Sequence, residues 1–332
     1  MPPAITVLAG GVGGSRFVLG VREAARRRWP SDSPSGTSAE IAVIANTGDD
    51  LWLSGVRLQP DVDSLLYALA GVNDTERGWG RAGDTERVSA ELREWGAGWP
   101  WFTLGDLDLG THLARTGWLR DGLTVSEVVA RLAARWPLGV TLLPMTDAEV
   151  DTQVRTAEGS MHFQEWWTRH RAAVPAIGFE NPGIESAAPG AGVLEAIAGA
   201  DAVLLAPSNP VVSIGPILAV PGIAEAVAAA RGGVAGVSPI IGGAVVRGMA
   251  DACLAALGIE TSAAAVGLLY GPRGEGGRGL LDAWLIAEED AALAPGLSAA
   301  GLRAVVAPLW MRDADTSAAL ASTAIDAALA AR

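Results

Sequence analysis

The sequence is poor in the residues that build several common kinds of site. It contains one cysteine, Cys253, and three histidines among 332 residues. A single cysteine forms no intramolecular disulfide, and the helical pattern around Cys253 favours a small buried side chain over a nucleophile. The histidines lack the spacing of zinc ligands, and no G-x-S-x-G segment is present. These absences argue against a zinc enzyme and against a Ser-His-Asp hydrolase.

Basic charge and long apolar runs are also scarce. The chain has 24 basic and 37 acidic residues, and its net charge of −13 argues against nucleic-acid binding. Half of the residues are hydrophobic, but no apolar run reaches the roughly 18 residues that span a bilayer. The N-terminal segment lacks the basic region and cleavage site of a signal peptide. We therefore expect a soluble, cytoplasmic protein that binds neither nucleic acid nor membrane.

Apolar segments alternate with amphipathic segments along nearly the whole chain. The apolar segments are continuous, which is typical of strands covered on both faces in a mostly parallel sheet. Strands are predicted at Ile5–Ala9, Ile41–Ala45, Trp101–Leu104, Val140–Leu143, Ala202–Ala206, Val234–Val237, Ala265–Leu269, Ala283–Ile286 and Ala304–Ala307. Helices are predicted at Arg16–Arg27, Ser64–Ala70, Thr85–Trp95, Val125–Arg135, Gly192–Ala198, Ile223–Ala230 and Ser317–Ala330. The expected fold is α/β, a Rossmann-like three-layer α/β/α arrangement with right-handed crossovers.

The length of 332 residues suits one large α/β domain, and we predict a single domain over residues 1–332. The segment Asp147–Gly159 has the pattern of a short hairpin that leaves the main sheet. We also expect a smaller subdomain, around residues 72–175, that covers a bound substrate.

The first candidate site is a glycine-rich loop between the first predicted strand and the first predicted helix. It contains Gly10, Gly11, Gly13 and Gly14. Glycines let a ligand approach the backbone, and the start of a helix favours an anion. The spacing fits neither the dinucleotide fingerprint, which argues against a nicotinamide-dependent oxidoreductase, nor a P-loop. The alternative interpretation is a glycine-rich turn that binds nothing.

A second loop, in the segment LLAPSNPVVSIGPIL, also passes from a predicted strand into a helix. Pro207 ends the strand, and a helix restarts near Ser213. Ser208, Asn209 and Ser213 supply uncharged hydrogen-bonding groups beside a helix N-terminus, which suits a phosphate. An ordinary capped turn remains the alternative to a ligand loop.

Four aspartates lie in two further loop segments, NTGDD and PDVDS. Asp49 and Asp50 follow the second predicted strand, and Asp61 and Asp63 begin a helix. Carboxylates close to an anion-binding loop are typical of a hard-cation site, and magnesium takes its remaining ligands from phosphate and water. We expect one or two of the four to cap turns. Asp49 and Asp63 are our candidates for metal binding and catalysis, and Asp50 and Asp61 for substrate contact.

Two more segments carry polar groups beside aromatic or apolar residues. LGDLDLGTH places Asp106 and His112 after a predicted strand, where they would position a substrate, although a lone histidine at a helix start is more often structural. In HFQEWW, His162 and Glu165 are expected to share one helix face. The two tryptophans that follow either line a pocket for a flat ring or, as we favour, pack in the core.

Together these segments resemble one family, the phospholactate transferases of coenzyme F-420 biosynthesis. The shared segments are, in order, LAGGVGGSRF, NTGDD, PDVDSLLYALAG, W-G-x-x-GDT, LGDLDLGTH, LLPMTD, HFQEWW, APSNPVVSIGPIL and VSPIIGG. The resemblance covers nearly the whole chain, and PSNP-x-x-SIGP and HFQ-x-W-W are its most specific parts. The glycine loop alone is shared with relatives that bind nucleotide sugars.

The resemblance implies a magnesium-dependent transferase. Such enzymes transfer a phosphoenolpyruvyl or phospholactyl group from a guanosine-diphosphate-activated three-carbon acid, and GMP leaves. The acceptor is the terminal ribityl hydroxyl of the deazaflavin 7,8-didemethyl-8-hydroxy-5-deazariboflavin. The chain is most similar to the actinobacterial members, which use enolpyruvate, and a homodimer is expected. The alternative is a regulatory nucleotide-sugar-binding protein of the related glycine-loop group.

The resemblance also assigns roles to the candidate residues. The glycine loop and residues 208–213 would hold the guanosine diphosphate, and Asp49 and Asp63 would carry magnesium or orient the attacking hydroxyl. The segment from Thr103 to Asp106 would face the deazaflavin. One position departs from the family pattern, because members often have Arg or Lys where this chain has Leu107. If that cation touches phosphate, Arg16 or Arg81 must replace it; otherwise the position is peripheral.

Overall fold

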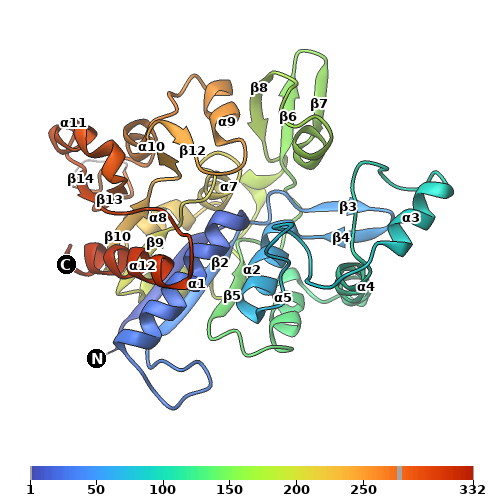
Figure 1. The fold of residues 1–332 in the computed structure, drawn as a ribbon, viewed down its shortest axis with the longest axis horizontal. Helices are drawn as coiled ribbons and strands as arrows, with labels where there is room; N and C mark the ends of the chain where they lie inside the picture. The colour runs from blue at the N-terminus through green and yellow to red at the C-terminus, as the bar shows by residue number, and fades with distance from the viewer. Residues whose placement is uncertain (1, 275–278, 332) are drawn as a thin grey trace.

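Seven parallel strands form the central sheet of the computed structural model, which describes residues 2–274 and 279–331 (Figure 1). The strand order across the sheet is β14-β13-β10-β9-β1-β2-β5. The strands are β1 (Ala4–Ala9), β2 (Glu40–Ala45), β5 (Thr141–Pro144), β9 (Ala202–Leu205), β10 (Gly233–Val237), β13 (Ala283–Ile286) and β14 (Arg303–Val306). The direction of chain progression reverses between β1 and β9, and open α/β sheets bind ligands at such a switch point.

Helices cover both faces of the sheet, because successive residues of each strand point to opposite sides. In β1, Val7 packs in the core cluster beneath the first set of helices, and Leu8 packs in the cluster on the other face. The first set is α1 (Gly11–Arg28), α2 (Pro60–Ala70), α5 (Val125–Ala133) and α12 (Ala314–Leu329). The second is α6 (Val193–Gly199), α7 (Ile214–Ala219), α8 (Ile223–Ala228), α10 (Ala263–Tyr270) and α11 (Ala294–Ala299). The predicted three-layer α/β/α fold is confirmed.

Two smaller lobes extend beyond the carboxyl ends of the strands (Figure 1). The first, here called the α4 lobe, combines the antiparallel pair β3 (Leu51–Leu53) and β4 (Val56–Leu58) with α3 (Arg87–Glu94) and α4 (Asp106–Arg120). The second, the β6 lobe, is an antiparallel sheet in the order β7-β6-β8 with a π-helix. Its elements are β6 (Gln153–Thr156), β7 (Gly159–His162), the π-helix Glu165–Arg169 and β8 (Ala176–Glu180).

Short elements complete the fold. They are the pair β11 (Ile240–Ile241) and β12 (Ala244–Val245), helix α9 (Ala250–Ala256), and the 3-10 helices Ile184–Ser186 and Glu288–Leu293. Cys253 lies in α9 and is buried, as its helical pattern indicates. Across residues 2–274 and 279–331, the structure contains no helix with both the length and the apolar character needed to cross a membrane.

The hairpin expected at Asp147–Gly159 is present, but its two strands β6 and β7 begin at Gln153 and end at His162. The range 72–175 contributes to both lobes and also supplies β5, which pairs with β2 in the central sheet. The role of this range as a substrate cover remains a prediction.

The strand predicted at Trp101–Leu104 is wrong, because this segment is a loop leading into α4. The Ser89 hydroxyl donates to the Leu104 carbonyl at 2.7 Å and accepts from its N–H at 3.0 Å. A side chain of α3 therefore satisfies the backbone groups that a neighbouring strand would otherwise pair. The Trp99 and Trp101 rings stack in the same loop, with centroids 4.6 Å apart.

The strand predicted at Ala265–Leu269 is also wrong, because these residues lie in helix α10. A short apolar run has no periodicity that separates a buried strand from a buried helix. The Ser262 hydroxyl caps the helix by accepting from the Ala265 N–H at 3.1 Å, and alanine and leucine favour the helical state.

Candidate active site

A cavity of about 870 Å³ lies at the carboxyl-terminal edge of the sheet, beside the switch point. Segments that follow β1, β2, β9, β10 and β14 form its walls, together with residues from both lobes. The predicted site residues that line it are Gly10, Gly11, Gly13, Asp49, Asp61, Asp63, Thr103, His112, Ser208, Asn209 and Ser213. Gly14, Asp50 and Asp106 lie outside this lining. The fold thus brings most of the candidates to one place.

The glycine loop is packed directly against the loop that follows β9. The Gly10 N–H donates to the Ser208 hydroxyl at 3.1 Å, and that hydroxyl donates to the Gly10 carbonyl at 2.7 Å. A Cβ on Gly10 would overlap the Asp61 carboxylate, and one on Gly14 would lie 2.6 Å from the Ser208 Oγ. These glycines therefore let three protein segments converge, in addition to exposing backbone to the cavity.

We predict that Gly10→Ala destabilises the protein by about 1–3 kcal/mol, because the new methyl group must displace the Asp61 carboxylate and Ser213. The matched control is Gly110→Ala in α4, where no atom lies within 4 Å of the added Cβ. That control is expected to raise the free energy of unfolding by about 0.5–1 kcal/mol. Urea unfolding of both variants measures the difference, and equal stability of the two would contradict the packing described here.

Asn46 organises a pair of buried carboxylates beneath the cavity. Its side-chain amide donates to Asp61 Oδ2 at 2.9 Å and approaches Asp49 Oδ1 at 3.5 Å. Gln164, from the start of the π-helix segment, donates to Asp49 Oδ2 at 3.1 Å. The Asp61 carboxylate also accepts from the Gly11 N–H at the N-terminus of α1. Three segments that are far apart in sequence thus hold Asp49 and Asp61 together.

Neither Asp49 nor Asp61 has a basic side chain of the described residues as its partner. Burial raises the pKa of Asp49 well above its ordinary value, and the charges of Asp61 and Asp50 raise it further. Burial raises the pKa of Asp61 to about 6, although hydrogen bonds from Asn46, Gly11 and Ser213 oppose that rise. Among the described residues neither carboxylate forms an ion pair. Such unneutralised pairs of buried acids are typical of functional sites.

Asp63 belongs to a different cluster, which contains its own cation. Its carboxylate forms a fully buried ion pair with Arg115. His112 lies between two acids, with Nδ1 3.6 Å from Asp63 Oδ2 and Nε2 3.3 Å from Asp108 Oδ1. The Tyr67 hydroxyl donates to Asp108 at 2.7 Å. Single ligand atoms of Asp63, Asp108 and His112 all lie within 4.8 Å of one another, which is the spacing of a metal site.

The charge of Arg115 distinguishes this cluster from the Asp49–Asp61 pair. Burial alone would raise the pKa of Asp108, but His112, Tyr67 and Arg115 together lower it. A cation bound here would meet the guanidinium that already neutralises Asp63. Asp63 Oδ2, however, has no hydrogen-bond partner in the part of the chain that the structure describes. That oxygen is buried, and His112 Nδ1 lies 3.6 Å from it.

Asp50 braces β4. It accepts a hydrogen bond from the Gln59 amide at 2.7 Å and lies 3.6 Å from the Arg57 guanidinium. Arg57 in turn makes two hydrogen bonds to Asp151, at 2.7 and 2.9 Å. Burial raises the pKa of Asp50 well above its ordinary value, despite the opposing charge of Arg57.

Asp106 joins α3 to α4. Its carboxylate accepts from the Thr85 hydroxyl at 2.6 Å and from the Val88 N–H at 3.1 Å, at the start of α3. Asp84 does the converse, accepting from the Leu107 and Asp108 N–H groups at 2.8 and 3.0 Å. Asp106 therefore binds a free N–H group at the start of α3, and Asp84 binds two at the start of α4.

Tryptophans supply much of the apolar surface of the cavity. The four that line it, from four different segments, are Trp79, Trp101, Trp167 and Trp310. Trp79 is 43% exposed and Trp310 40% exposed, which is unusual for so large an apolar side chain. Trp166 is buried in the core as favoured, whereas Trp167 faces the cavity. The prediction that His162 and Glu165 share a helix face is wrong, because His162 ends β7.

Comparisons with known proteins show which family the chain resembles. The family model described as 2-phospho-L-lactate transferase CofD matches residues 5–303. The chain belongs to the CofD family. Its similarity to curated relatives extends over nearly the whole length of both chains. A phosphoenolpyruvate transferase of Thermobifida fusca is 49% identical over 330 residues, covering 98% of each chain. One of Kitasatospora aureofaciens is 48% identical over 325 residues, covering 97% of this chain and 96% of that one.

Among solved structures, Protein BH3568 from Bacillus halodurans superposes with a TM-score of 0.60 at 18% identity, covering 98% of this chain and 99% of that one. This likeness concerns the fold alone.

Leu107, where the resemblance led us to expect Arg or Lys, lies away from the cavity. Leu107 is 46% exposed on α4 and is not among the lining residues. Of the two arginines considered as replacements, Arg81 lies between the rings of Tyr67 and Trp136, at 5.9 and 5.7 Å from their centroids. Arg16 lines the cavity. The arrangement favours Arg16 as the cation available to a ligand.

Proposed function

We propose that the chain transfers a phosphoenolpyruvyl, or phospholactyl, group to the terminal ribityl hydroxyl of 7,8-didemethyl-8-hydroxy-5-deazariboflavin. The donor is a three-carbon acid activated by guanosine diphosphate, and GMP is released. The family and the names of the curated relatives support transfer of such a group in coenzyme F-420 biosynthesis. The relatives are named phosphoenolpyruvate transferases, so we favour the enolpyruvyl donor.

The observation that carries this proposal is the unneutralised pair Asp49 and Asp61 at the floor of the cavity. Both carboxylates are buried, neither has a basic side chain as an ion-pair partner among the described residues, and burial raises the pKa of each. A bound cation would stabilise both charges. We propose that these two residues hold Mg²⁺, with Asp61 in place of Asp63, which Arg115 already neutralises. The ion would supply charge neutralisation for the transferring phosphate.

Phosphoryl transfer depends on correct positioning of the reacting groups and on charge neutralisation more than on a covalent bond to the protein. The ribityl oxygen forms a bond to the phosphorus that bears the three-carbon acid, and the bond from that phosphorus to the GMP oxygen breaks. We propose that Asp63 Oδ2 orients the hydroxyl and accepts its proton. Arg115 and His112 hold the carboxylate in place for this role.

The remaining lining suits two planar ligands. We propose that the glycine loop and the Ser208–Ser213 segment bind the guanosine diphosphate portion, because they meet at the switch point. Thr103 and the stacked aromatic loop around Trp101 would face the deazaflavin. Aromatic side chains pack well against flat rings. We also propose a homodimer that works in the cytoplasm, with residues 72–175 covering the bound substrates.

A nucleotide-sugar-binding regulatory protein is the competing hypothesis, since that group shares the glycine loop. Such a protein has no need of the Asp49–Asp61 pair. The two functions differ in turnover, so the test is GMP formation from the guanylylated acid, measured by chromatography with and without the deazaflavin. We expect GMP in stoichiometric amounts only when donor, acceptor and Mg²⁺ are all present. Binding of donor without acceptor-dependent GMP release would contradict the transferase.

A further inference from the structure

Side chains of both charge signs line the cavity. The buried aspartates line it together with four arginines: Arg16, Arg171, Arg247 and Arg312. The chain contains no lysine, so all 24 of its basic residues are arginines. Nine arginines away from this cavity form ion pairs within residues 2–274 and 279–331, among them Arg27 with Glu23 and Asp315. None of the four arginines of the cavity forms an ion pair with a carboxylate of the described residues.

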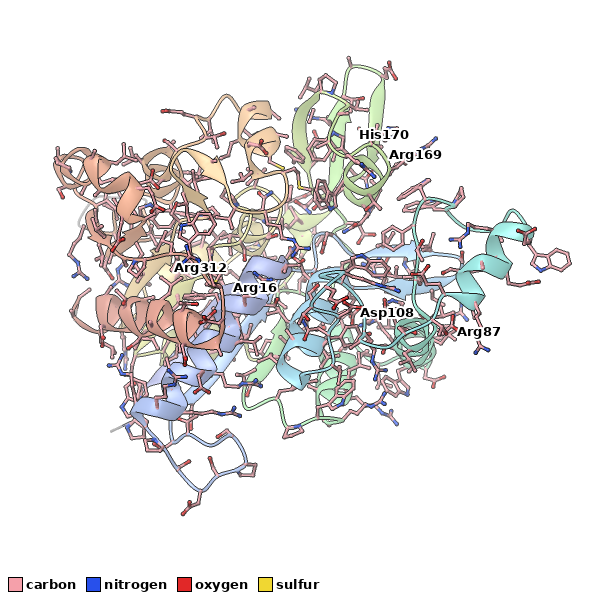
Figure 2. All side chains as sticks on the ribbon, in the orientation of Figure 1. Arg16, Arg87, Asp108, Arg169, His170 and Arg312 are labelled. Carbon is pink, nitrogen blue, oxygen red and sulfur yellow. The ribbon has the colours of Figure 1, made fainter. Side chains whose placement is uncertain are left out.

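Arg16 and Arg312 also line a second, smaller cavity. A side chamber of about 400 Å³ adjoins the main cavity, and both arginines line both spaces together with Trp79 and Met311. Figure 2 shows Arg16 on α1 and Arg312 on the segment that leads into α12, near each other in this view. These helices pack side by side. The two guanidinium groups thus stand at the junction of the two spaces.

Neither guanidinium is neutralised within the described ranges 2–274 and 279–331. Arg16 has no hydrogen-bond or ion-pair partner there. The charge of Arg312 acts on its neighbours Asp313 and Glu289, but forms an ion pair with neither. In a chain with a net charge of −13, two free arginines at one cavity junction indicate an anion as their partner.

The position of Arg16 along α1 indicates which anionic group of the donor the two arginines bind. Arg16 lies five residues beyond Gly11, the first residue of α1, which is about 7.5 Å along the axis. The diphosphate portion of the donor is proposed to bind at the glycine loop, and Arg16 lies further along α1 than that loop. The next anionic group of the donor is the carboxylate of the three-carbon acid. Paired arginines present the planar donors that bind a carboxylate by two parallel hydrogen bonds.

We infer that Arg16 and Arg312 bind the carboxylate of the three-carbon acid and thereby select an acidic donor. This inference rests on the proposed function of the same cavity. It assigns a role to the segment around Arg312, which follows the last residue matched by the family model, Arg303. A donor without the carboxylate would leave both guanidinium groups without a partner.

The test compares Arg16→Gln and Arg312→Gln with Arg27→Gln, a control at the far end of α1. All three changes remove one charge, but Arg27 lies on the outer surface, paired with Glu23 and Asp315. The KM for the guanylylated enolpyruvate is measured for each variant, and the dissociation constant of GDP is measured by quenching of the cavity tryptophans. We expect a rise in KM of about 10-fold to 100-fold for the first two variants, with the control unchanged.

The GDP measurement distinguishes carboxylate from phosphate as the bound group. GDP has no carboxylate, so its dissociation constant is expected to change by less than about 3-fold in both variants. An equal rise for GDP and for the donor would assign the arginines to phosphate and overturn the inference. An unchanged KM in both variants would also overturn it. Absence of transfer by the wild-type chain would instead refute the proposed function, which keeps the two failures distinct.

Discussion

Asp49→Asn is expected to lower kcat/KM for the transfer by about 1000-fold, while the metal-free protein becomes more stable. The loss corresponds to about 4 kcal/mol of transition-state stabilisation, a reasonable value for weakening one cation ligand. The increase in stability of the metal-free protein is expected because Asp49 is a buried acid beside Asp61 with no compensating charge. Its removal is expected to raise the free energy of unfolding by about 1–3 kcal/mol at pH 8.

The pH dependence of stability follows from the same pair. Both acids have a higher pKa in the folded chain than in the unfolded one, so the folded state binds more protons. The stability of the metal-free protein therefore falls as the pH rises, for Asp61 between about 4 and its folded value of about 6. Mg²⁺ is expected to raise the Tm more at pH 8 than at pH 5. Asp49→Asn is expected to reduce both effects.

Thermal unfolding with and without Mg²⁺, at both pH values, measures these effects. Asp32→Asn is the control, because Asp32 is exposed in the loop between α1 and β2, away from the cavity. It is expected to change neither activity nor the response to Mg²⁺. If Asp49→Asn lowered the stability of the metal-free protein, the assignment of an unneutralised acid pair would be wrong.

Asp63→Ala is expected to destabilise the protein by about 3–5 kcal/mol, because it leaves the Arg115 guanidinium buried without a partner. Loss of activity in this variant would therefore not identify a catalytic role. The double variant Asp63→Leu/Arg115→Met removes both charges and is expected to be more stable than Asp63→Ala. Urea unfolding of the two variants tests this order. A loss in Asp63→Ala of less than about 0.5 kcal/mol would contradict the buried ion pair.

The sequence predicted the sheet well because its strands are continuous apolar runs separated by recognisable turns. The loops after β1, β2 and β9 were placed correctly for the same reason, since parallel strands deliver their carboxyl ends to one edge. The two wrong strands were short apolar runs, at Trp101–Leu104 and Ala265–Leu269. Pattern alone does not separate such runs from a loop or a helix, and side chains of Ser89 and Ser262 decide the outcome.

The sequence could not predict which groups Asp61 and Asp63 contact. Asp61 and Asp63 are two residues apart in one helix, and only the three-dimensional structure shows that one meets Asp49 and the other Arg115. Asn46 and Gln164 were not singled out, although both lie in the quoted segments NTGDD and HFQEWW. Their amides became evident only once the segments met. Trp79, Trp101 and Trp310 were not singled out as pocket residues, and the core was favoured for Trp167, because a surface tryptophan and a core tryptophan look alike in sequence.

The most direct test of the central claim is the mass of the deazaflavin after incubation with the protein, Mg²⁺ and each guanylylated acid. The claim predicts that the deazaflavin gains a phosphoenolpyruvyl group, or, with the lactyl donor, a phospholactyl group that is heavier by two hydrogens. It also predicts that the gain is lost in Asp49→Asn. An unchanged deazaflavin mass with every donor would contradict the account.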